Sequence, residues 1–171
     1  MPRQAVAEAL SKLENLESGS LLQKNMVFMD YLQNGIPVKF FENGTERSSI
    51  VRLLDYNDPS KNNFIVANQW TFIEHSEKRP DIILFINGLP LVVIELKSPS
   101  REETDASAAY RQLRNYFYEI PTLFAYNAIC VMSDMRPQRR ALLPPAKIAS
   151  WNGKQRTEAM KIRSMPLLIP F

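Results

Sequence analysis

Two acidic residues and a lysine bracket one apolar stretch of the chain, Arg79–Pro99 (RPDIILFINGLPLVVIELKSP). Asp81 precedes the first of its two apolar runs, and Glu95 and Lys97 follow the second. Carboxylates in such a group suit Mg²⁺, which binds through one or two carboxylates and keeps several waters. A bound divalent ion polarises a phosphoryl oxygen and activates water, and a nearby ammonium can orient that water. The residue types indicate metal-assisted phosphoryl chemistry, although a surface ion pair at a strand end would show the same short pattern.

A β-hairpin through Asn87-Gly88 would bring these groups together, because this dipeptide accepts the positive φ values of a tight turn. If paired positions sum to 176, Asp81 lies opposite Glu95. Side chains alternate along a strand, so Glu95 and Lys97 point to one face and Leu96 to the other. The two carboxylates and the ammonium then meet at one end of an apolar hairpin.

The same register makes a prediction about the loop. It pairs Phe85 with Leu91, which requires a loop of three or five residues around 87–89 rather than a two-residue turn. Pro90 fits at the edge of such a loop, since proline cannot donate to a β-ladder.

The acid and lysine spacing resembles a known nuclease motif. Asp81-(x13)-Glu95-x-Lys97, preceded by Pro80, is similar to the PD-(D/E)xK signature. The longer stretch 79–99 resembles, almost residue for residue, the nuclease motif of the restriction subunit of type I restriction–modification enzymes. The likeness covers most of 51–134 and, more loosely, the N-terminal helices.

In this family, a Gln-x-x-x-Tyr pair belongs to the nuclease site, and Gln112 and Tyr116 match it. Residues four apart share one helical face. A glutamine amide and a phenol can both hydrogen-bond a DNA phosphate or a metal-bound water. Without the resemblance, a tyrosine packed on the sheet beside a surface glutamine would explain the pair equally well.

The resemblance implies Mg²⁺-dependent hydrolysis of phosphodiester bonds in double-stranded DNA, as the cleavage module of a type I restriction enzyme. Asp81 and Glu95 would hold Mg²⁺, with the carbonyl of Leu96 as a third ligand. Lys97 would position or activate the attacking water. The implied partners are separate modification (methyltransferase) and specificity subunits. No GxxxxGK[ST] phosphate loop occurs in the sequence, so ATP is expected to act only through a motor domain outside this chain. The chain is then expected to be an excised nuclease fragment or a truncated gene product.

Two other functions stay open from the residues. One is a non-catalytic DNA-binding or assembly module that keeps the nuclease fold. The other is a stand-alone PD-(D/E)xK repair or recombination nuclease that works without restriction partners. Intact Asp81, Glu95 and Lys97 favour an enzyme over a decayed module.

The composition is that of a globular domain, with 171 residues, 45% hydrophobic and 23% charged. No apolar run approaches the ~20 residues of a membrane span. The single cysteine, Cys130, excludes an internal disulfide framework and fits a cytoplasmic location. We expect Cys130 to be buried and the lone His75 to lie on the surface.

The net charge of +3 is unevenly distributed. The segment 136–163 contains eight basic residues and one acid, a net charge of +7 that leaves −4 for the rest. Arg136, Arg139 and Arg140 are the candidate DNA contacts, because a basic flank beside an acidic site attracts a polyanion. A solvated tail would show the same composition.

The expected fold is α/β (α+β), a restriction-endonuclease-like mixed β-sheet flanked by helices. Residues 1–135 would form the nuclease domain with its N-terminal helices, and 136–171 a basic, proline-interrupted segment that starts the link to a motor. Consecutive strands are expected to pair as an antiparallel meander. The expected elements are helices at 2–16, 20–34 and 105–118, a hairpin of 38–41 with 48–54 through the turn Glu42-Asn43-Gly44-Thr45, and strands at 63–72, 82–86, 91–94 and 122–132.

Overall fold

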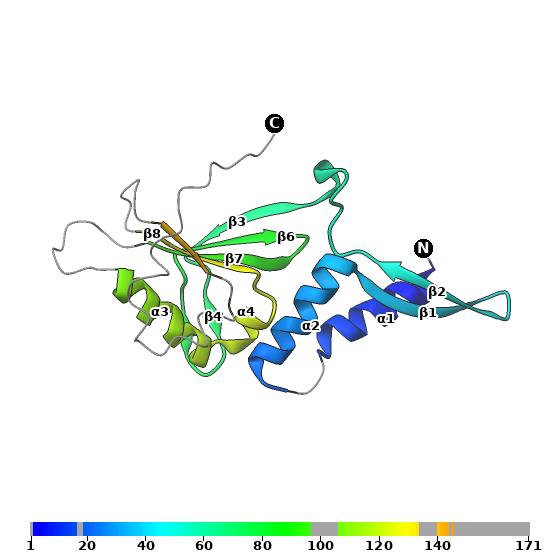
Figure 1. The fold of residues 1–171 in the computed structure, drawn as a ribbon, viewed down its shortest axis with the longest axis horizontal. Coiled ribbons are helices and arrows are strands. Elements are labelled where there is room, and N and C mark those ends of the chain that lie inside the picture. The colour runs from blue at the N-terminus through cyan, green and yellow to red at the C-terminus, as the bar shows by residue number, and fades with distance from the viewer. Residues whose placement is uncertain (1, 17–18, 97–105, 134–139, 144, 146–171) are drawn as a thin grey trace.

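The computed structural model describes residues 2–16, 19–96, 106–133, 140–143 and 145. It has an α+β fold, as predicted, with a mixed five-stranded sheet and a separate two-stranded hairpin at the N-terminal end (Figure 1). None of the helices in the described ranges is long and apolar enough to cross a membrane.

Helix α1 spans Arg3–Glu14 and helix α2 spans Leu21–Asn34. A capping box begins α2, in which the Ser20 hydroxyl accepts from the Gln23 amide and the Gln23 side chain accepts from the Ser20 amide. Gly35, at φ 83°, ends it. Both predicted helices are therefore confirmed to within two residues at each end.

Strands β1 (Ile36–Glu42) and β2 (Thr45–Val51) form their own two-stranded sheet, joined by the predicted Asn43-Gly44 turn. Side chains of α1 bond the backbone of β1 at three points: Glu8 Oε2 accepts from Lys39 N (2.8 Å), Gln4 Oε1 accepts from Phe41 N (3.3 Å), and Lys12 Nζ donates to Pro37 O (2.6 Å). The predicted continuous meander is therefore wrong for this hairpin, which does not join the main sheet, but the antiparallel pairing of the strand after Asn63 with 82–86 is confirmed. Helix α1 occupies the edge of β1 that another strand would need.

The main sheet has the order β3-β6-β7-β8-β9, with β7 and β8 parallel and the other pairs antiparallel. Helices α3 and α4 lie beside it, and a short β4–β5 hairpin follows β3 (Figure 1). The elements are β3 (Phe64–Asn68), β4 (Phe72–Ile73), β5 (Glu77–Lys78), β6 (Ile82–Ile86), β7 (Leu89–Leu96), α3 (Ala106–Glu119), α4 (Pro121–Ala125), β8 (Ile129–Ser133) and β9 (Arg140–Leu143).

Two predicted strands are shorter than expected. The predicted strand 122–132 is helix α4 followed by β8, because Pro121 occupies the first turn of a helix, where its missing N–H costs nothing. The predicted strand 63–72 stops at Asn68, since Gln69 adopts φ 51°. The predicted helix 105–118 is confirmed as α3.

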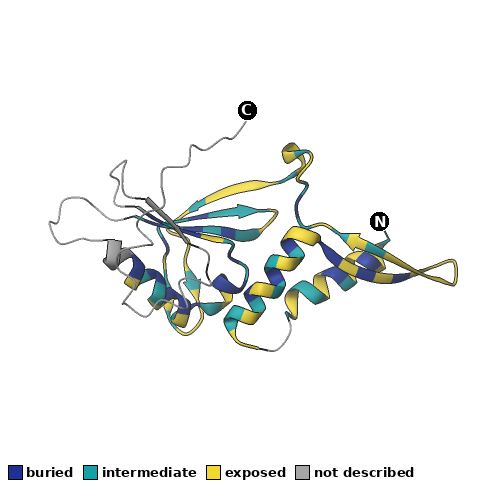
Figure 2. Cartoon of the chain, in the orientation of Figure 1, coloured by how far each residue is buried: buried dark blue, intermediate teal, exposed yellow. Residues whose placement is uncertain are grey.

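The largest apolar cluster lies between the sheet and α3–α4. Figure 2 shows the buried residues concentrated in the sheet and the packed faces of the helices, and exposed residues at the tip of the β1–β2 hairpin. Leu113 of α3 packs with Ile83 and Val93 of the sheet, all three of them fully buried. Cys130 is buried in the same cluster, as predicted, and His75 is exposed, as predicted.

Two buried asparagines tie α2 to this core. Asn25 Nδ2 donates to the carbonyls of Phe124 (3.0 Å) and Asn127 (2.8 Å). Asn127 Nδ2 donates in turn to the carbonyls of Leu91 (3.0 Å) and Ile129 (3.1 Å), and its Oδ1 accepts from Cys130 Sγ (3.1 Å). Because both amides are satisfied by backbone groups, they fix where α2, α4 and β7 meet.

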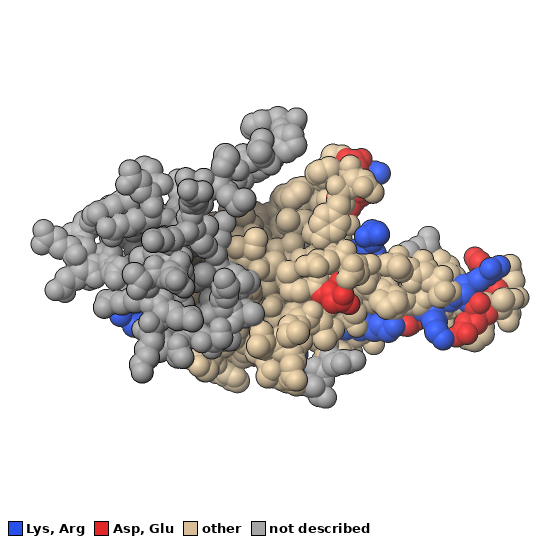
Figure 3. All heavy atoms as spheres, in the orientation of Figure 1, with Lys and Arg blue, Asp and Glu red and all other residues tan. Residues whose placement is uncertain are grey.

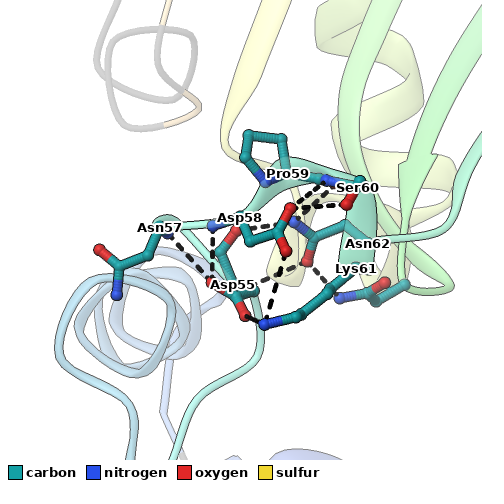
Figure 4. Close-up of polar contacts among 8 residues, drawn as sticks. Asp55, Asn57, Asp58, Pro59, Ser60, Lys61 and Asn62 are labelled. Carbon is teal, nitrogen blue, oxygen red and sulfur yellow. Dashed lines mark hydrogen bonds and ion pairs between the residues drawn. The ribbon is translucent and has the colours of Figure 1, made fainter.

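A polar loop, Asp55–Asn62, connects the N-terminal hairpin to β3 (Figure 4). Asp55 Oδ1 accepts from the amides of Asn57 (3.0 Å) and Asp58 (2.9 Å), and Asp58 caps the 3₁₀ helix η1 (Pro59–Lys61). These bonds stabilise the turn locally. The same loop also contacts the β6–β7 turn, since Asn87 Nδ2 donates to Asn62 Oδ1 (2.9 Å).

Asn87→Ala is expected to destabilise the chain by about 2–3 kcal/mol, because it places alanine at φ 51° and removes the side-chain bonds to Asn63 N (2.8 Å) and Leu53 O (2.9 Å). Asn87→Gly keeps the turn conformation and should cost about 1–2 kcal/mol. Urea unfolding measures both. Equal losses would show that the positive φ contributes nothing.

Candidate active site

The β6–β7 hairpin has the predicted register at its open end, but its turn differs from the predicted one. Ile82 pairs with Ile94, which sums to 176 as predicted. The turn, however, is the two-residue Asn87-Gly88 at φ 51° and 81°. A β-bulge between Leu84 and Phe85 then shifts the register. The predicted longer loop is therefore wrong. The extra residue of the bulge shifts the strand register by one position, which is the shift that a longer loop would have produced.

Because of the bulge, two residues near the turn have other partners than the predicted register gives them. Phe85 pairs with Pro90 rather than Leu91, and Ile86 pairs with Leu89. Pro90 therefore lies inside β7, not at a loop edge.

Asp81 immediately precedes β6, and Glu95 is the penultimate residue of β7. The backbone N–H of Leu96 donates to Asp81 Oδ2 at 2.8 Å, which holds Asp81 against the end of β7. Glu95 is only 1% exposed, and it points to the face that also carries Val93 and α3. Burial of an ionisable carboxylate is costly, so this position is a functional-site candidate by its physics.

Helix α3 brings Gln112 and Tyr116 to the same place. Gln112 Nε2 donates to the Tyr116 hydroxyl at 2.6 Å, as expected for residues four apart. Burial raises the pKa of Tyr116 to about 12; the negative charges of Glu95 and Asp81 and a hydrogen bond with Glu95 add to this rise, and the Gln112 bond opposes it. Since those charges act on Tyr116, four of the five predicted catalytic side chains lie at one site: Asp81, Glu95, Gln112 and Tyr116.

Gln69 also belongs to this site, although sequence reasoning missed it. Its Nε2 donates to Asp81 Oδ1 at 2.8 Å, and its backbone N–H donates to the Asp81 carbonyl at 3.0 Å. The β3–β6 and β6–β7 registers, extended by one residue, place Gln69, Asp81 and Glu95 in one row across three strands. An exposed glutamine after a strand carries no signal of this kind in the sequence.

The site offers carboxylate oxygens, the ligand type that a hard divalent cation prefers. Asp81 and Glu95 supply two carboxylates, and the described residues contain no group of three or more His, Cys, Asp or Glu that could hold a metal. Mg²⁺ commonly binds through one or two carboxylates and completes its coordination with water and phosphate oxygens. The Leu96 carbonyl as a third ligand stays a prediction.

Four predicted site residues are not placed. Lys97, Arg136 and Arg139 lie outside the described residues. The backbone of Arg140 begins β9, but its side chain is not among those described. Their roles stay predictions.

Tyr116→Phe is expected to make the chain less sensitive to alkali. The raised pKa means that the folded chain keeps a proton between pH 10.0 and about 12 that the unfolded chain has lost. Stability therefore falls as the pH rises through this window. The variant lacks the group and should lose less stability there, as urea unfolding at pH 9, 10 and 11 would measure. Parallel losses in variant and wild type would refute this account of Tyr116.

The sequence of this chain matches that of known proteins. The model of the type I restriction enzyme R protein N terminus matches residues 2–139. The chain is 37% identical over 136 residues to the HindI type I restriction enzyme endonuclease subunit of Haemophilus influenzae, covering 78% of this chain and 13% of that protein. It is 35% identical over 124 residues to a candidate endonuclease subunit of the type I enzyme MjaIXP of Methanocaldococcus jannaschii, covering 70% of this chain and 12% of that protein. The chain thus corresponds to about one eighth of these relatives, and it belongs to the family of type I restriction enzyme R protein N-terminal regions.

Proposed function

We propose that this chain is a Mg²⁺-dependent endonuclease domain that hydrolyses phosphodiester bonds in double-stranded DNA. The observation that carries the proposal is the row of Asp81 and Glu95 at one hairpin end, with Tyr116 and Gln112 above it on α3. The relatives' names as type I restriction enzyme endonuclease subunits support the same reaction.

Each residue has a distinct part in this proposal. Asp81 and Glu95 hold the cation, which when bound would polarise the scissile phosphate and lower the pKa of its water. Tyr116 keeps its proton at neutral pH because its pKa is about 12, so it acts as a hydrogen-bond donor and not as a base. Gln112 fixes the phenol by donating to its oxygen. Lys97 would position the attacking water.

The family membership supports a wider setting for this reaction. Cleavage would be coupled to an ATP-driven motor and to modification and specificity subunits, all supplied by other parts of a restriction complex. Site choice would then lie outside this chain, which needs only to bind DNA and cut it.

Metal titration of the chain tests the proposal. Two adjacent carboxylates repel each other until a divalent ion neutralises them, and a DNA phosphate completes the coordination of Mg²⁺. We therefore expect weak Mg²⁺ binding by calorimetry, tightened by a short duplex and lost in Asp81→Ala, with Mg²⁺-dependent cleavage of plasmid DNA. Tight binding without DNA that survives Asp81→Ala would place the metal elsewhere, and binding of DNA without any cleavage would favour the assembly module.

DNA contacts are proposed for Arg136, Arg139 and Arg140. Figure 3 shows charges of both signs on the β1–β2 hairpin, so the hairpin is not a basic surface. The hairpin also contains an exposed ion pair between Lys39 and Glu46 (3.5 Å). Replacing all three arginines with glutamine is expected to reduce the slope of log affinity against log salt by up to about three charges, equally for every sequence. An unchanged slope would mean that these arginines do not contact DNA and belong to a solvated segment.

A further inference from the structure

We propose that Gln69 is a positioning residue that orients the Asp81 carboxylate for cation binding. The inference rests on the proposed function and deepens it, because it concerns the same site.

Gln69 grips Asp81 at two points. Its side-chain amide bonds Asp81 Oδ1 at 2.8 Å, and its backbone N–H bonds the Asp81 carbonyl at 3.0 Å. On the other side, Leu96 N–H bonds Asp81 Oδ2 at 2.8 Å. Each carboxylate oxygen is thus held by a donor from a neighbouring strand or strand end, so rotation of the carboxylate would break at least one bond.

The backbone of Gln69 is committed to this arrangement. It adopts φ 51°, one of only three positive φ values at non-glycine positions in the described chain. The other two, Asn43 and Asn87, lie in Asn-Gly hairpin turns, where positive φ is needed. Gln69 is in no such turn and is not of a residue type that favours this conformation, and such outliers concentrate at functional sites.

The chemistry of the side chain also suits a cation site. A lysine or arginine in this place would bond Asp81 equally well, but it would neutralise the carboxylate and repel a divalent ion. A carboxamide donates a hydrogen bond without net charge. Asp81 therefore stays fixed and keeps its full negative charge for the cation, as in the outer shells of metal sites.

The competing explanation is that Gln69 only ends β3. Two substitutions separate these explanations. Both remove the side-chain carboxamide of Gln69, but they differ in how readily the new residue adopts a positive φ. Gln69→Ala leaves an unfavourable φ, whereas Gln69→Gly relieves it. The Gln69→Gly variant should therefore have a higher melting temperature than Gln69→Ala.

The experiment measures free Mn²⁺ by electron paramagnetic resonance in titrations of the whole chain with a short DNA duplex, together with the melting temperature of each variant. We expect Gln69→Ala and Gln69→Gly to weaken Mn²⁺ binding by about the same factor, roughly 10-fold or more, although their melting temperatures differ. Gln33→Ala, an exposed glutamine on α2, is the matched control and should bind as wild type does.

The outcomes distinguish this inference from the proposed function. Wild-type affinity in both Gln69 variants, with binding lost in Asp81→Ala, would overturn the role of Gln69 alone. Affinity that follows melting temperature, weak in the alanine variant and normal in the glycine variant, would also overturn it. If Asp81→Ala bound Mn²⁺ as wild type does, the proposed function would fall, and this inference with it.

Discussion

Glu95→Gln is expected to reduce the rate of DNA cleavage at least ~10²-fold, because it removes a charged group that acts on the reacting phosphate through the cation. Glutamine has the shape of glutamate, so it opens no cavity at a position that is 1% exposed. Alanine would be a poorer choice, since it would leave a void beside Tyr116. Single-turnover cleavage with excess chain measures the effect.

The stability of the same variant gives an independent check. A buried carboxylate loses its hydration, so the neutral amide is expected to leave the melting temperature unchanged or raise it. Glu46→Gln is a matched control on the exposed hairpin, where only a surface ion pair with Lys39 is lost. Cleavage at the wild-type rate by folded Glu95→Gln would remove Glu95 from the catalytic group.

Lys97→Ala is expected to lose cleavage to a similar degree.

Asn127→Ala is expected to destabilise the chain by about 3 kcal/mol, since it removes three hydrogen bonds of a buried side chain, each worth about 0.5–1.5 kcal/mol. The side chain is fully buried and donates to Leu91 O (3.0 Å) and Ile129 O (3.1 Å), and it accepts from Cys130 (3.1 Å). For a chain of this size the melting temperature should fall by roughly 6–12 °C.

Thermal unfolding of Asn115→Ala provides the comparison for this variant. Asn115 is an exposed residue of α3, and its change should stay within about 0.5 kcal/mol. A melting temperature for Asn127→Ala within 2 °C of wild type, roughly the effect of a surface change, would show that the buried amide is dispensable.

The features that sequence predicted well are those encoded by neighbouring residues. Ser20 and Gly35 mark the ends of α2 because capping needs only the residues next to the helix. Gln112 and Tyr116 meet because helical spacing alone brings them together. The facing of Asp81 and Glu95 was also predictable, since the two apolar runs fix the register at the open end of the β6–β7 hairpin.

The errors arise where distant contacts decide. The apolar run after Pro121 suits a buried helix as well as a strand, and periodicity cannot separate the two in so short a run. The bulge beside Phe85 leaves no mark on residue types. Gln69 joins the site only because of the register in which β3 pairs with β6; the sequence predicts this pairing but not its register.

The packing of α1 against β1 has a consequence for local unfolding of the chain. Ala5 and Ala9 of α1 share a small apolar cluster with Ile36, Val38 and Phe40, separate from the cluster under α3. Units with their own small cores open by themselves, at lower free energy than global unfolding. Amide hydrogens of β1 should therefore exchange with solvent deuterium faster than those of β7, through an opening that leaves the Asp81–Glu95 hairpin closed.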